Sequence, residues 1–198
     1  MMDIGIDGAA RYNLLGSLVV AIVVVDKVKW RRFASLPIRD SDNLSRIQRD
    51  KIVALTQKHL EHLFVYKIHP KDIKEDNRND LEAQAMTECL NTYKDFWKQN
   101  IYIANFDRSR GKFLNRVAQF LPKSLKDKNL NFNKWVIENN CDEKHRPCAL
   151  ASIYAQHYSD LEYDDIKRVY GETGNGLATD PKTKEFMDKN KDNPHLRR

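Results

Sequence analysis

The chain has 198 residues, of which 41% are hydrophobic and 31% are charged, and no low-complexity tract interrupts them. This composition excludes a disordered or fibrous chain and predicts a single domain, residues 1–198, that buries a core without disulfides or metals as staples. The 34 Lys and Arg residues exceed the 28 Asp and Glu residues by six. That surplus favours a polyanionic partner without identifying one.

The apolar segment Leu14–Val25 is shorter than the roughly 20 residues that a membrane-spanning helix needs, and Gly16-Ser17 interrupts it. Asp3 and Asp7 precede this segment, where a signal peptide carries positive charge. The chain has three cysteines, Cys89, Cys141 and Cys148, so they cannot all pair with one another. We therefore expect reduced thiols, no membrane partner and an intracellular protein, either cytoplasmic or nucleoid-associated.

Runs of β-branched residues predict the strands. The first two, Ile4–Asp7 and Leu18–Val25, are joined through Gly16-Ser17 and are expected to be neighbouring buried strands. Further strands are expected at Leu63–Ile68, Ile101–Phe106 and Lys134–Ile137.

Helical patterns lie between these strands, and several begin with Ser, Asp or Asn in a capping position. The expected helices are Leu44–Leu60, Leu81–Trp97, Phe113–Leu121, Pro147–Tyr158 and Lys182–Asp188. Two early strands followed by alternating helices and strands predict an α/β fold with helices on the faces of the sheet, plus a C-terminal helical extension from about residue 160 to 198. Such a sheet places ligands at the carboxyl ends of its strands.

Three aspartates fall where this fold gathers side chains. Asp7 lies in the first strand, Asp107 directly follows the predicted strand Ile101–Phe106, and Asp142 precedes the helix that begins near Pro147. Converging carboxylates repel one another unless a hard cation such as Mg²⁺ or Mn²⁺ holds them. Two such ions about 4 Å apart activate water and stabilise the leaving oxygen in phosphodiester hydrolysis. Taken singly, each aspartate is more often a turn or cap residue.

Five segments, in order along the chain, resemble motifs of the ribonuclease HII family. The family opens with Asp-Glu-Ala-Gly-Arg-Gly before a Val/Ala-rich strand, and its later motifs are Asp-Ser-Lys, Ile-Asp-x-x-Asn with Ala-Met, Asp followed by Ala-Ala-Ala-Ser-Ile-x-Ala, and Gly-Ser-Gly-Tyr-Pro-Ser-Asp-Pro. The last is typical of archaeal and eukaryotic members. The corresponding segments are Asp7–Tyr12, Asp40–Asp42, Ile73 and Asn77 with Ala85-Met86, Asp142 with Ala149–Ala155, and Gly174–Pro181.

The resemblance implies a ribonuclease H-like fold with a mixed central sheet. It implies a protein that cuts the RNA strand of RNA–DNA hybrids, or cuts at ribonucleotides embedded in DNA, with two Mg²⁺ or Mn²⁺ ions and four carboxylates. Asp7, Asp107 and Asp142 carry over as catalytic and metal-binding residues, whereas the fourth carboxylate, a Glu, is replaced by Gly8. With a ligand missing, we expect one ion or none to bind.

The nucleic-acid contacts implied by the resemblance are also altered. The residues expected to touch nucleic acid are Arg11, Tyr12, Ser41, Arg108 and Arg110. Where the family has the second Gly of its Gly-Arg-Gly loop, the Lys of Asp-Ser-Lys, the Lys and Arg after the Ala-rich helix, and a late Tyr, this chain has Tyr12, Asp42, Gln156, Ser159 and Leu177. The scaffold motifs remain while the substrate contacts differ.

We expect conventional hydrolysis to be weakened or lost unless another carboxylate takes the missing position, and two hypotheses follow. In the first, the chain is a metal-dependent endoribonuclease in which Glu143 or Asp42 supplies the missing carboxylate, and Arg108, Arg110 and Lys112 supply phosphate contacts. In the second, it is an inactive family member that binds nucleic acid or a protein partner, through the basic-aromatic turn Lys27–Arg32 or the basic tail 182–198. Cys141, His145 and Cys148 have metal-ligand spacing, but no fourth ligand is evident and buried thiols are the simpler interpretation.

Overall fold

A computed structural model describes residues 1–92, 96–104, 107, 109–121 and 132–197. Within this part of the chain the strands are β1 (Met2–Ala9), β2 (Leu18–Asp26), β3 (His62–Ile68), β4 (Asn100–Ala104) and β5 (Trp135–Glu138). They form one sheet in the order β3-β2-β1-β4-β5. Because β1 pairs antiparallel with β2 but parallel with β4, the sheet is mixed, as expected.

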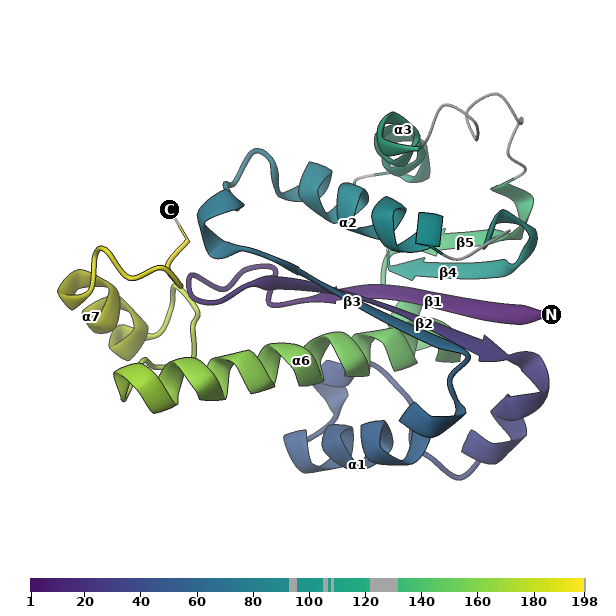
Figure 1. Cartoon of the computed structure of the whole chain (residues 1–198), viewed down its shortest axis with the longest axis horizontal. Coiled ribbons are helices and arrows are strands. Elements are labelled where there is room, and N and C mark those ends of the chain that lie inside the picture. Colours follow the sequence, from purple (N-terminus) through teal and green to yellow (C-terminus); the bar gives the residue numbers. More distant parts are fainter. Residues whose placement is uncertain (93–95, 105–106, 108, 122–131, 198) are drawn as a thin grey trace.

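Helices cover both faces of the sheet. Figure 1 shows α2 (Arg78–Thr92) and α3 (Arg110–Phe120) on one face, and α1 (Arg46–Thr56) and α6 (Arg146–Tyr170) on the other. The short helix α5 (Cys141–Lys144) leads into α6, and α7 (Pro181–Lys189) lies beyond the far end of α6. Short 3-10 helices lie at Lys27–Phe33, Ser41–Asn43, Gln57–His59, Pro70–Asp72, Phe96–Lys98 and Phe132–Lys134.

The central strand β2 is apolar on both sides because both of its faces are covered. Val20 and Ile22 pack into the core beneath α2 and α3, whereas Val19 and Val23 pack into the second core beneath α1 and α6. A glycine allows α6 to approach β1: a Cβ atom at Gly5 would lie 1.8 Å from the carbonyl oxygen of Pro147. This close approach brings the start of α6 against β1, two residues before Asp7.

The predicted strands are confirmed, but several element ends differ from the predictions. The described part of β4 ends at Ala104, and the last two residues of the predicted strand, 105–106, lie outside the described residues. Helix α1 begins at Arg46 because Ser45 forms a capping box with Gln48. Helix α2 begins at Arg78, and its predicted last turn to Trp97 falls partly on residues 93–95, outside the described part.

Helix α6 runs on to Tyr170, so residue 160, the predicted start of a C-terminal extension, lies inside a continuous helix. Beyond α6, the glycine-rich segment 174–176 leads to α7, whose start at Pro181 is capped by Asp180 as the sequence predicts. In the described part of the chain, every helix is too short or too polar to cross a bilayer.

Candidate active site

A cleft opens where β1 and β4 end, between the two helical layers. Two cavities of about 500 and 450 Å³ form it and share the lining residues Asp7, Gly8, Arg11, Tyr12 and Asp142. The first cavity extends toward α2 and is also lined by Glu82, Ala104 and Asp107. The second extends toward Asp40, Asp42, Gln156 and Leu177. The cleft therefore gathers residues from most of the segments singled out in the sequence.

Asp7, Asp142 and Asp40 form an acidic group on the α5 side of the cleft. Desolvation of its carboxylate raises the pKa of Asp7 well above the ordinary value, and the charge of Asp142 raises it further. Desolvation and the charge of Asp40 raise the pKa of Asp142 to about 6. Within the described residues no Lys or Arg forms an ion pair with these three aspartates. Their mutual repulsion is therefore not offset by an internal cation.

The residue of β4 next to Asp7 is Ala104, whereas the sequence analysis expected Asp107 directly after this strand. Strands β1 and β4 pair in parallel up to Ile6 with Ile103. Asp7 and Ala104 are the next residues on each strand, and both line the first cavity. Asp107 comes three residues after Ala104, and residues 105–106 between them lie outside the described part of the chain. The position beside Asp7 therefore carries a methyl group.

Asp107 lies in the same cavity, but its carboxylate is already bound by the protein. It is 7% exposed and accepts hydrogen bonds from Asn79 Nδ2 at 3.0 Å and from Arg116 Nε at 3.0 Å. Arg116 also pairs with Asp80 of α2, and its hydrogen bond to Asp107 raises the pKa of the guanidinium. Both carboxylate oxygens of Asp107 therefore already accept hydrogen bonds from side chains of the protein.

Glu82, which the sequence analysis missed, places its carboxylate close to Gly8. A Cβ atom built on Gly8 would lie 3.6 Å from Glu82 Oε1. Glu82 is 3% exposed and forms an ion pair with Arg11. One signal was available: in helical spacing Glu82 falls on the apolar face that includes Met86 and Cys89, where a charged residue is rare without a partner.

The other carboxylates considered as replacements do not approach that position. Asp42 lines the second cavity as an exposed side chain, and Glu143 is exposed and lines neither cavity. Neither lies where Glu82 does.

The expected nucleic-acid contacts divide into exposed and occupied groups. Tyr12 is 69% exposed at the edge of the cleft. Arg11 is held by Glu82, and Ser41 is buried, with its hydroxyl accepting a hydrogen bond of 2.8 Å from Ser152. The exposed residue Arg110 begins α3 and donates to the carbonyl of Phe132 at 2.9 Å. Arg108 lies outside the described residues.

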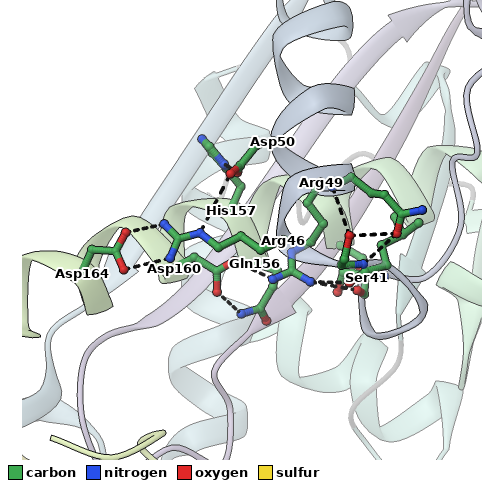
Figure 2. Close-up of polar contacts among 12 residues, drawn as sticks. Ser41, Arg46, Arg49, Asp50, Gln156, His157, Asp160 and Asp164 are labelled. Atoms are coloured by element: carbon green, nitrogen blue, oxygen red, sulfur yellow. Dashed lines mark hydrogen bonds and ion pairs between the residues drawn. The ribbon is translucent and has the colours of Figure 1, made fainter. Parts of the chain in front are cut away.

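The Ser41 segment is fixed by a polar network between α1 and α6, shown in Figure 2. Arg49 donates to the carbonyl oxygen of Ser41 at 3.3 Å and to Asp160 Oδ2 at 2.6 Å. Gln156 donates to the other oxygen of Asp160 at 2.8 Å. Two further pairs, Arg46 with Asp164 and His157 with Asp50, join the same helices (Figure 2). Gln156, at the position of the family's Lys, is therefore bonded to its own helix.

The aromatic ring of the basic turn Lys27–Arg32 is half-buried and contacts other parts of the protein. Trp30 Nε1 donates to Asp3 Oδ2 at 2.9 Å, and the ring packs edge-on against Phe33. The guanidinium of Arg146 lies 5.6 Å from the ring centroid. The segment is a 3-10 helix packed on the protein, which weakens its interpretation as a nucleic-acid surface.

Among the described residues, the side chains in the cleft do not fit a two-ion site. In the described part of the chain no group of three His, Cys, Asp or Glu side chains is arranged to hold a metal ion. Asp107 and Glu82 are bound by Arg116 and Arg11, and Gly8 and Ala104 supply no ligand. Cys141 and Cys148 are buried free thiols, in agreement with the simpler interpretation of that motif.

The strand order and the mixed pairing, with helices on both faces, define a ribonuclease H-like fold. A solved ribonuclease H2 from Pyrococcus horikoshii superposes on the whole chain and 93% of its own length with a TM-score of 0.83 and 28% identity. The family model for ribonuclease HII matches residues 4–198. The chain therefore belongs to the ribonuclease HII family, as its sequence motifs indicate.

Individual ribonuclease HII proteins are moderately similar to this chain in sequence. A ribonuclease HII from Pyrococcus horikoshii is 31% identical over 187 residues, which cover 93% of this chain and 80% of the relative. A solved complex of PCNA with ribonuclease HII from Archaeoglobus fulgidus matches all of this chain and 94% of that one, with a TM-score of 0.78 and 25% identity.

Proposed function

We propose that this ribonuclease HII family protein binds RNA–DNA hybrids or ribonucleotide-containing DNA in the cleft, and that its hydrolysis of the RNA strand is weakened or lost. The observation that carries the proposal is which side chains lie beside Asp7, at the ends of β1 and β4. Beside Asp7 stand Gly8 and Ala104, and the nearby Asp107 is bound by Arg116. The group that remains, Asp7 with Asp142 and Asp40, has too few ligands at one place for the two cations that the family resemblance implies.

The net charge of +6 supports binding of a polyanion, and the exposed ring of Tyr12 at the edge of the cleft can stack on a base. Losing interactions that act in the transition state lowers the rate about tenfold for each 1.4 kcal/mol. The carboxylate missing at Gly8 and the Asp107 carboxylate bound by Arg116 therefore predict activity near the background rate while binding persists.

The test combines binding with cleavage of one labelled RNA–DNA hybrid. Binding is measured by fluorescence anisotropy without divalent cations at several salt concentrations, and cleavage with Mg²⁺ or Mn²⁺. We expect salt-dependent binding with hydrolysis close to background. A Gly8→Glu/Ala104→Asp variant should gain hydrolysis, because it adds two carboxylates beside Asp7. A Cβ atom at Gly8 would lie 3.4 Å from Val19 O, which is an ordinary contact. Robust wild-type cleavage that Asp107→Asn abolishes would show instead that the site is a rebuilt metal-dependent nuclease.

A role as a subunit that binds a protein partner is the alternative. It is suggested by the Archaeoglobus fulgidus relative, which was solved with PCNA. A stable co-purifying protein combined with no measurable affinity for hybrid, duplex or single strands would favour this alternative.

A further inference from the structure

Tyr12 presents its ring to solvent from a backbone that is held at several points. The residue lies in a turn closed by a 3.2 Å hydrogen bond from Asn13 N to the carbonyl of Ala10, whose φ of 60° is left-handed. On the other side of the turn, Leu14 N donates to Gly176 O at 2.7 Å, and Arg197 Nη1 donates to the carbonyl of Arg11 at 3.2 Å. The ring is 69% exposed, so the fold does not need it for packing. A large aromatic surface on a fixed turn is suited to stacking with a ligand.

Positive charge surrounds this ring. The guanidinium carbons of Arg11 and Arg78 lie 5.8 and 5.5 Å from the ring centroid. Arg11 is neutralised by Glu82, whereas Arg78, within the described residues, forms no ion pair and its buried Nε has no hydrogen-bond partner. Arg197, which is 7% exposed, likewise has a buried Nη2 without a hydrogen-bond partner in the described part. Within the described residues, the positive charge of Arg78 beside the turn is therefore not neutralised by an ion pair with a carboxylate.

We infer that Tyr12 and Arg78 form a binding site for an unpaired nucleotide of the nucleic acid, with the base on the Tyr12 ring and the adjoining phosphate at Arg78. This inference rests on the proposed binding of nucleic acid in the cleft and narrows its ligand. A base inside a continuous duplex has both faces covered by its neighbours, so an exposed ring gains a partner only from a base that has left the stack. Arg78 supplies a cation for the phosphate at the same place.

The test compares two ligands of equal length by fluorescence anisotropy in EDTA, so that no cleavage occurs. One is a continuous RNA–DNA hybrid, and the other contains one unpaired adenosine in the RNA strand. We expect the wild type to bind the second ligand about tenfold more tightly, which is within the range of base–aromatic stacking. Tyr12→Phe should keep this preference, and Tyr12→Leu, which retains apolar bulk without a ring, should remove it.

Arg78 is tested through the salt dependence of binding. Arg78→Gln should weaken binding of the ligand with the unpaired nucleotide and lower the slope of log affinity against log salt by about one, because one phosphate contact is lost. Arg78→Lys should keep the slope. Ile47→Ala is the matched control, because Ile47 is 81% exposed on α1, lines neither cavity and should leave both affinities unchanged.

The possible failures are distinguishable. Equal wild-type affinity for the two ligands, or a preference that survives Tyr12→Leu, overturns the inference and leaves the proposed function standing. If neither ligand binds in a salt-dependent manner, the proposed function fails as well. Thermal melting of each variant checks that the fold is intact, and the exposure of Tyr12 predicts unchanged melting.

Discussion

The two sides of the cleft contain similar carboxylates in opposite electrostatic settings. On the side of α2 and α3, Glu82 and Asp107 each face a guanidinium group, from Arg11 and Arg116. On the α5 side, Asp7 and Asp142 face each other and Asp40, and their pKa values are raised. The carboxylates on the side of α2 and α3 are therefore paired with cations of the protein, whereas those on the α5 side repel one another.

This difference teaches that the cleft is not simply a metal site with one ligand missing. A buried carboxylate stays ionised only when a cation or several hydrogen bonds compensate its desolvation. At Asp107 the compensation comes from within the chain, so its charge is satisfied without any ion. At Asp142 no cation of the described residues supplies this compensation. We therefore expect added metal cations to bind on the α5 side of the cleft. Four predictions test this comparison, from the largest expected effect to the smallest.

Replacing Glu82 by Gln should give the largest loss of stability. The change leaves the Arg11 guanidinium, which is mostly buried, without its counter-charge, and breaking a buried pair from one side costs about 3 kcal/mol. Urea unfolding at neutral pH measures the loss. Glu88→Gln, an exposed position on the same helix, is the control and should change stability by less than about 0.5 kcal/mol. Equal losses in the two variants would contradict a structural ion pair at Glu82.

Replacing Arg116 by Met should lower stability by about 2 kcal/mol, because Asp107 loses charge-assisted hydrogen bonds while Arg116 itself is partly solvated. The double variant with Asp107→Asn tests the cause. If the two groups stabilise each other, the double variant should be more stable than the sum of the two single losses predicts. Additive losses would mean that Arg116 acts through Asp80 alone.

Replacing Asp142 by Asn should raise stability above pH 6. The native pKa of about 6 lies above the ordinary value of 3.8. The native state therefore binds this proton more tightly than the unfolded chain, and stability falls as pH rises from about 4 through 6. Asn cannot ionise, so the variant should gain about 1–2 kcal/mol at pH 7, allowing for partial exposure of the site. Urea unfolding between pH 4 and 8 measures it, and parallel wild-type and variant curves would refute the cause.

Adding Mn²⁺ should have the smallest effect. We expect millimolar Mn²⁺ to stabilise the wild type by less than about 1 kcal/mol, as weak binding to one incomplete site does. The shift in melting temperature should disappear in Asp142→Asn and persist in Asp107→Asn, because only the α5 side lacks an internal cation. A large shift that depends on Asp107 would reverse the comparison between the two sides.

The strands and the pairing of Asp7 with Asp142 could be read from the sequence because the signals are local. The continuous apolar run Leu18–Val25 predicts a strand that is buried on both faces, and β2 is such a strand. Asp7 in the first strand and Asp142 just before an Ala-rich helix follow from ordered motifs, and both residues line the cleft. Sequence alone thus predicted the sheet and the family, which are confirmed, and it singled out two aspartates that line the cleft.

Tertiary structure alone decided the other side, because strand register and long-range partners leave no local trace. Whether Ala104 or Asp107 stands beside Asp7 depends on where β4 stops and how it pairs with β1. That Glu82 is a buried ion-pair partner depends on Arg11, 71 residues earlier in the chain. The sequence indicated that a carboxylate is missing at Gly8. The fold shows that two nearby carboxylates, of Glu82 and Asp107, form ion pairs with arginines.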